Sequence, residues 1–247
     1  MTARPSWPPQ SAPRLFVDQQ LADGATISLE GPHAHYLLHV MRIKPTETVV
    51  LCDNLTGAWV AEAVHVSRRS LELRVTDHIS PREDVPDLWL LAAPIKRARF
   101  DMMIEKACEL GVAQIVPVTT QRTVIDKINS DRMRAQVTEA AEQCGRTTLP
   151  DIAPVTTLLA VLADWPDTRT LYFADETGGE PFMPAAGPAA ILIGPEGGFA
   201  PEERNAIRAL PAARAISLGP RILRAETAAL TAISIWMAAA GDWNSAT

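Results

Sequence analysis

Apolar runs that alternate with helical segments after residue 88 constrain the fold of this chain more than any other feature. Between the runs lie segments with apolar residues at helical spacing, over residues 100–108 and 131–144. Strands that are apolar throughout are typical of a parallel sheet buried on both faces. We therefore predict an α/β domain over residues 88–247. The strand-like runs are LWLLAAP (88–94), VAQIVPV (112–118), LYFAD (171–175), AAILIG (189–194) and ARAISLG (213–219).

The chain before residue 88 has a different pattern. Three short β-branched segments, TVVLCD (48–53), WVAEAVHV (59–66) and SLELRVTDHI (70–79), are separated by turn residues. They predict a small β-barrel-like domain over residues 14–80, with one helical piece at 33–42. PREDVPD (81–87) is the predicted linker, and residues 1–13, with four prolines, are the predicted flexible tail.

Charge and cysteine content limit the function classes. The formal net charge of −6 argues against binding nucleic acid through bulk positive charge. However, residues 1–150 carry 17 Lys/Arg and 18 Asp/Glu, so the acidity lies in the last third. Cys52, Cys108 and Cys144 are far apart and form no CxxC pair, which favours free thiols in a reducing cytoplasm over disulfides or zinc.

No membrane segment or secretion signal is expected. The longest uncharged run near the C-terminus is 15 residues, Thr227–Gly241, whereas about 20 are needed to span a bilayer. The first 13 residues contain no apolar segment of the kind that signal peptides carry. We interpret 227–241 as a buried or interface helix.

Two strand-like runs end in Gly-Pro loops, GPEGG (194–198) and GPRILRAE (219–226). Because ligands of parallel sheets bind at the carboxyl ends of strands, these loops are the candidate site. No GxGxxG or GxxxxGK[ST] motif supports a dinucleotide or P-loop site, and Glu196 would repel phosphate. The alternatives are a plain strand–turn–helix connection, solubilising arginines, and Thr227 as a helix N-cap.

Histidines and cations give weaker indications. His33, His35 and His39 have a spacing that metal ligands use, but no Asp, Glu or Cys lies nearby, so a polar or RNA-facing helix is favoured and no metal is expected. No GxSxG motif is present, and no histidine lies after residue 80, which removes Ser-His-Asp catalysis. KRARFD (96–101) begins a helix with three cations, and these require either solvent or an anionic partner such as RNA phosphate.

Several segments, in this order, resemble the RsmE family of 16S rRNA uridine-N3 methyltransferases. The resemblance extends over nearly the whole chain after residue 13, and the last two segments are the most specific. The segments are RLFV (14–17), HYLLHVMR (35–42), KRARFDMMIEKACELGV (96–112), AAEQCGRTTLP (140–150), LIGPEGGF (192–199) and SLGPRILRAETAAL (217–230).

The resemblance implies a fold, a cofactor and partners. It implies a C-terminal SPOUT-type α/β domain with a trefoil knot, an N-terminal PUA-like barrel and a homodimer acting on 16S rRNA or the assembled small subunit. The two Gly-Pro loops would then hold S-adenosylmethionine. The implied cofactor-binding residues are Ile193, Gly194, Gly198, Leu218, Gly219, Arg221, Ile222, Leu223 and Thr227.

Uridine N3 must lose its proton before it can attack a methyl group, so the implied reaction needs anion stabilisation or a base. Arg224 is the candidate for stabilising negative charge, and Glu196 or Glu226 would accept the proton or orient an arginine. The candidate RNA contacts are Arg14, Arg42, Lys96, Arg122 and Arg146. Two alternatives remain open: a SPOUT methyltransferase with another RNA target, and a non-catalytic RNA-binding factor of the same fold.

Overall fold

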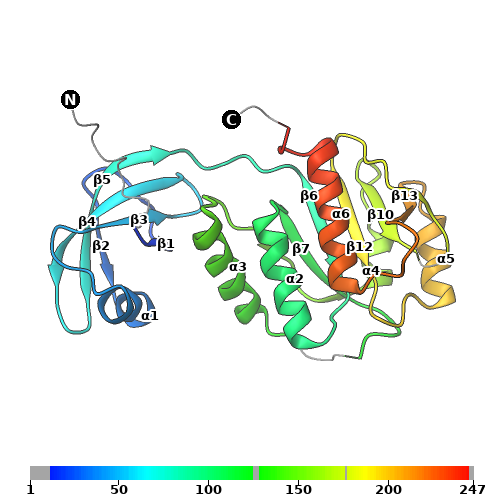
Figure 1. Cartoon of the computed structure of the whole chain (residues 1–247), viewed down its shortest axis with the longest axis horizontal. Coiled ribbons are helices and arrows are strands. Elements are labelled where there is room, and N and C mark those ends of the chain that lie inside the picture. The colour runs from blue at the N-terminus through cyan, green and yellow to red at the C-terminus, as the bar shows by residue number, and fades with distance from the viewer. Residues whose placement is uncertain (1–11, 125–127, 176, 245–247) are drawn as a thin grey trace. The chain divides into compact units, whose positions relative to one another are not determined.

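The computed structural model describes residues 12–124, 128–175 and 177–244, which form two compact units (Figure 1). The N-terminal unit contains the described residues up to Asp84 together with Ala141–Leu149, and the C-terminal unit contains the rest. Most of the tail predicted at 1–13 lies outside the described residues. No described helix is both long and apolar enough to cross a bilayer.

The N-terminal unit is built on one five-stranded sheet. Its order is β1-β3-β4-β5-β2, with β1 parallel to β3 and the other pairs antiparallel. A helical piece follows β2, first as α1 and then as the π-helical turn η1. The predicted β unit with one helical insertion is therefore confirmed. Its elements are β1 (Arg14–Phe16), β2 (Thr26–Leu29), α1 (Gly31–His35), η1 (Tyr36–Val40), β3 (Thr48–Cys52), β4 (Ala58–Val66) and β5 (Leu71–Ser80).

Alternating side chains form the core of this unit. In β5, Leu71, Leu73 and Val75 are buried while the residues between them are not, as expected for a sheet with one covered face. Ala34 and Leu37 of the helical piece pack into the same apolar cluster.

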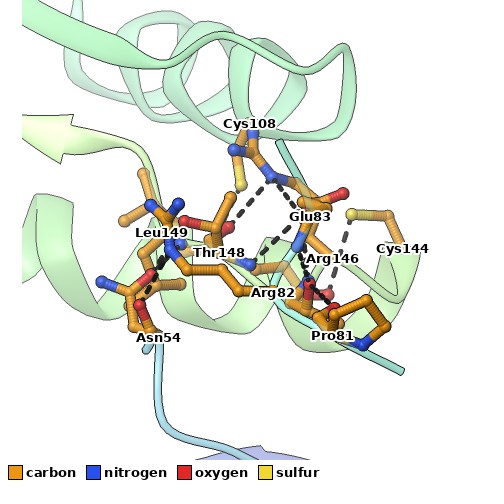
Figure 2. Close-up of polar contacts among 12 residues, drawn as sticks. Asn54, Pro81, Arg82, Glu83, Cys108, Cys144, Arg146, Thr148 and Leu149 are labelled. Carbon is orange, nitrogen blue, oxygen red and sulfur yellow. Dashed lines mark hydrogen bonds and ion pairs between the residues drawn. The ribbon is translucent and has the colours of Figure 1, made fainter. Parts of the chain in front are cut away.

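Residues 141–149 belong to the N-terminal unit, although the sequence-based bounds put them in the domain starting at residue 88. Polar side chains elsewhere in the N-terminal unit accept hydrogen bonds from backbone amides and one hydroxyl of this segment (Figure 2). The Asn54 side-chain oxygen accepts from the Leu149 amide at 2.7 Å and from the Thr148 hydroxyl at 2.9 Å. Glu83 Oε1 accepts from the amides of Thr147 and Thr148 at 2.9 and 3.1 Å. The residues that these contacts join are far apart in the sequence, so local sequence patterns did not predict them.

The C-terminal unit contains a sheet in which every strand pair is parallel, and the predicted α/β fold is confirmed. The order is β11-β13-β10-β12-β6-β7-β8, with β9 pairing to β7. Its strands are β6 (Leu88–Ala92), β7 (Gln114–Thr119), β8 (Asp151–Ile152), β9 (Thr156–Thr157), β10 (Thr170–Ala174), β11 (Glu180–Pro181), β12 (Ala189–Ile193) and β13 (Ala213–Ser217).

Helices cover this sheet. α2 packs against α6, which also contacts β12, while α4 contacts α5 (Figure 1). Leu91 and Leu192 join the apolar cluster beneath α4 and α5, and their strand neighbours Leu90 and Ile191 are buried as well. Both faces of the central strands are therefore buried, which explains why these strands are apolar throughout. The helices are α2 (Arg97–Glu109), α3 (Ser130–Cys144), α4 (Leu158–Ala163), α5 (Pro201–Ala209) and α6 (Ala225–Ala240).

Candidate functional site

The candidate site is a pocket of about 460 Å³ at the carboxyl ends of three neighbouring strands. β10 lies between β12 and β13, and all three are parallel, so the loops that follow them meet at one edge of the sheet. The two Gly-Pro loops line this pocket, as the sequence predicted. The loop after β10, including Asp175, Gly178 and Gly179, also lines it and was missed. Its only signal was an apolar run that ended in Asp and was followed by two glycines.

Most of the residues predicted for this site are brought together in it. The two that do not line the pocket are Glu226 and Thr227. Thr227 is exposed and is not the N-cap of α6, because that position is held by Arg224. Ile222 is 90% exposed, which leaves its apolar side chain unburied at the pocket rim. The predicted residues that line the pocket are Ile193, Gly194, Glu196, Gly198, Leu218, Gly219, Arg221, Ile222, Leu223 and Arg224.

The loop after β12 is held in a tight turn. The Gly198 amide donates to the Pro195 carbonyl at 2.8 Å, and Gly198 has a φ of +66°, which a side chain would disfavour. A Cβ on Gly194 would lie 3.1 Å from the ring of buried Phe199. The loop is therefore shaped by its own glycines and by the aromatic ring behind it.

Contacts from the loop after β7 also hold this turn. Arg122 Nη1 donates to the Gly197 carbonyl at 2.6 Å. The buried carboxylate of Glu203 accepts from the Gln121 amide at 2.8 Å and from the Ala200 amide, which precedes α5, at 2.9 Å. Arg122, predicted as an RNA contact, is thus also a contact of the pocket loop.

The two predicted carboxylates both lie next to Arg99, which the sequence did not single out. Arg99 Nη1 is 3.8 Å from Glu196 Oε1, and Arg99 Nε is 3.6 Å from Glu226 Oε1. The Glu226 side chain is 8% exposed, and that of Glu196 is 45% exposed. Arg99, one of the three cations at the start of α2, therefore has two protein carboxylates as its anionic partners.

Asp175, directly after β10, is a buried anion at the pocket wall. Its carboxylate is 2.7 Å from Arg208 Nη2 and 3.4 Å from Arg204 Nε, and it accepts from the Thr177 hydroxyl at 2.7 Å. Burial acts to raise the pKa of Asp175, but the hydrogen bonds from Arg208 and Thr177 outweigh it and hold the pKa below its ordinary value. The ionised group therefore joins the loop after β10 to α5.

The predicted RNA contacts lie in different environments. Arg42 and Lys96 are exposed, and Arg14 is half-buried. Arg146 is only 6% exposed, with Nε donating to the Thr148 carbonyl at 3.0 Å and lying 3.4 Å from Glu83 (Figure 2). Arg146 is therefore held by residues of its own unit, and its contact with RNA phosphate stays a prediction.

Basic side chains gather around a second pocket, in the N-terminal unit. This pocket, of about 770 Å³, lies between the helical piece and the turn from β4 to β5. Arg42, at its edge, has a φ of +56°, an uncommon backbone conformation for a side chain of this size. Arg68 and Arg69 were not among the residues predicted from the sequence. The basic residues that line the pocket are His35, His39, Arg42, Arg68 and Arg69.

The histidines do not form a metal site with other ligands in the described part of the chain. The rings of His35 and His39 lie 4.8 Å apart, centre to centre. Among the described residues, no three His, Cys, Asp or Glu side chains are grouped so as to hold a metal ion.

Comparisons with known proteins match both units. Residues 82–237 match the model of an RNA methyltransferase domain, and residues 29–76 match that of an RNA methyltransferase PUA domain. Ribosomal RNA small subunit methyltransferase E of Rickettsia conorii is 29% identical over 229 residues, which cover 90% of this chain and 93% of that protein.

Two solved structures are similar over nearly the whole chain. Ribosomal RNA small subunit methyltransferase E from Neisseria gonorrhoeae, bound to S-adenosyl methionine, has a TM-score of 0.87 and 26% identity, covering 94% of this chain and 100% of that one. A protein from Legionella pneumophila, solved in complex with the same cofactor, has a TM-score of 0.86 and 28% identity, covering 94% of this chain and 99% of that one.

Proposed function

Since this chain belongs to the RNA methyltransferase family, we propose that it transfers a methyl group from S-adenosylmethionine to N3 of a uridine in 16S rRNA. The observation that carries the proposal is the pocket formed by three loops at the carboxyl edge of the parallel sheet. A similar chain, that from Neisseria gonorrhoeae, binds the cofactor named here.

The pocket suits a ligand of this class. Its volume of about 460 Å³ lies within the range of about 300–1,000 Å³ for small-molecule sites. Ile193, Leu218 and Leu223 supply apolar walls, while Gly194 and Gly219 allow backbone groups to approach adenine and ribose closely. When bound, the cofactor supplies a methyl group on a positively charged sulfur.

The remaining chemistry falls to the side chains at the pocket. Arg224 is exposed on the pocket wall, where its guanidinium can stabilise negative charge on the uracil oxygens. Glu196 and Glu226 are both adjacent to Arg99, which supports the second of their two predicted roles, the orientation of an arginine, over proton removal. The N3 proton then passes to solvent before the methyl group is transferred, and Arg224 stabilises the anion that remains.

RNA binding is assigned in this proposal to cations of both units. The basic pocket of the N-terminal unit contains Arg42 and adds Arg68 and Arg69 to the earlier candidates. Arg14, Lys96, Arg122 and Arg146 remain candidates. The salt dependence of RNA binding reports such contacts, because each neutralised phosphate releases counterions.

The proposal also includes a homodimer, a knotted C-terminal domain and action in the cytoplasm. Light scattering of the purified chain tests the dimer. Methyl transfer measured separately on naked 16S rRNA and on isolated small subunits shows which of the two is the substrate.

The central test is to map modified nucleosides in 16S rRNA from a strain lacking this protein, and again after complementation. We expect one N3-methyluridine to disappear and to return. Loss of a different modified nucleoside would indicate another RNA target. Failure to bind S-adenosylmethionine by calorimetry would instead indicate a non-catalytic RNA-binding factor.

Arg224→Ala tests the assignment of the anion-stabilising group. The activation barrier should rise by about 2–4 kcal/mol and lower the turnover accordingly, while cofactor affinity changes much less. Arg224→Lys should restore only part of the rate, since it keeps the charge and loses the planar fork. A parallel loss of rate and cofactor affinity would indicate that Arg224 binds the cofactor and does not stabilise the uracil anion.

A further inference from the structure

Arg99 occupies an unfavourable position on α2. It is the third residue of that helix, where the helix dipole is positive and disfavours a cation. It is also one-third exposed, so solvent is available to it. Instead, its guanidinium lies between two carboxylates from different segments, Glu196 of the loop after β12 and Glu226 of the first turn of α6.

Glu226 depends on this contact more than Glu196 does. Its side chain is 8% exposed, and its Oε2 atom is buried with no hydrogen-bond partner among the described residues. A buried carboxylate needs a compensating charge, and the ion pair found for it within the described chain is with Arg99. Glu196 is 45% exposed and is hydrated by comparison.

The location of Glu226 relates this ion pair to the pocket. Arg224 is the N-cap of α6 and lies two residues before Glu226, so the anchoring of Glu226 fixes the backbone from which Arg224 extends. Glu196 itself lines the pocket. Arg99 thus joins the start of α2 to both Gly-Pro loops.

We propose that Arg99 is a positioning residue, which holds Glu226 and Glu196 and thereby places Arg224 at the pocket. This inference rests on the proposed methyl transfer for its kinetic consequences. Removal of Arg99 leaves the buried Glu226 carboxylate uncompensated, and the first turn of α6 then loosens to hydrate it.

If Arg99 acts through Glu226, a substitution at Glu226 should offset part of the effect of removing Arg99. Arg99→Ala should lower kcat by about tenfold or more, with the KM for S-adenosylmethionine changed less than about threefold, because the altered group is Arg224. Adding Glu226→Gln removes the uncompensated charge, so the double variant should be more active than Arg99→Ala alone. Arg99→Lys should lie between wild type and Arg99→Ala, since it keeps the charge.

Hydrogen exchange of residues 225–230 provides a readout that does not depend on activity. Exchange should be faster in Arg99→Ala than in wild type and should slow again in the double variant. Arg97→Ala is the matched control, because Arg97 is an exposed cation on the same turn of α2. It should leave both kcat and exchange unchanged.

Three outcomes would overturn the inference. The first is a double variant no more active than Arg99→Ala, which would mean that Arg99 does not act through Glu226. The second is an Arg97→Ala variant that is equally impaired, and the third is wild-type kcat in Arg99→Ala. If wild type methylates no rRNA, the proposed function fails, while the exchange comparison still decides whether Arg99 anchors α6.

Discussion

Replacement of Gly219 by alanine separates backbone strain from contact with the cofactor. Gly219 has a φ of +116° and lines the pocket, and a Cβ at this position would have no atom within 4 Å. The added methyl group therefore meets nothing in the protein itself. If the pocket binds S-adenosylmethionine, the methyl group occupies space that the ligand needs.

Gly187 is a matched control for the strain. Its φ is +113°, a Cβ there would also have no atom within 4 Å, and it is not a pocket residue. Each substitution should destabilise the fold by about 1–3 kcal/mol, because alanine disfavours this backbone conformation. Only Gly219→Ala should weaken cofactor binding, by about 1–3 kcal/mol for a methyl group forced against the ligand. That corresponds to roughly 5- to 150-fold in Kd.

Urea denaturation measures the strain in both variants, and calorimetry measures the Kd for S-adenosylmethionine. Gly219→Val should lower the affinity further, since its side chain is larger and branched. Equal cofactor affinity in Gly219→Ala and Gly187→Ala would contradict this prediction. In that case the loop after β13 does not meet the ligand at this residue.

Three further predictions concern single side chains. Asp175→Asn should cost about 2 kcal/mol at neutral pH. The depressed pKa of Asp175 contributes stability above pH 3.8 that wild type loses as the pH falls further, so the variant should show a flatter acid limb when urea midpoints are measured against pH. Alkylation at pH 8, mapped by mass spectrometry, should label exposed Cys144 first, because burial raises the pKa of the Cys52 thiol to about 11. Arg42→Ala should flatten the log–log salt dependence of RNA binding by about 0.7, and an unchanged slope would remove it from the RNA surface.

The pattern of apolar residues along the sequence predicted the buried strands and the longer amphipathic helices. The run AAILIG (189–194) predicted β12, Ala189–Ile193, because a strand buried on both faces must be apolar throughout. The amphipathic segment 131–144 predicted α3, Ser130–Cys144, because its apolar residues recur at the helical period. Short elements with little periodicity, such as β11 and α4, were not predicted.

The amino-acid pattern was enough to predict the two kinds of unit, the strands that carry the Gly-Pro loops and the residue types available to the pocket. Tertiary structure alone decided that β10 lies between β12 and β13, so that Asp175 joins the pocket. It also decided that Arg99 lies between Glu196 and Glu226. The physical reason is that strand order and ion pairing bring together residues distant in the chain, whereas hydrophobic periodicity reports only the burial of each segment along its own axis.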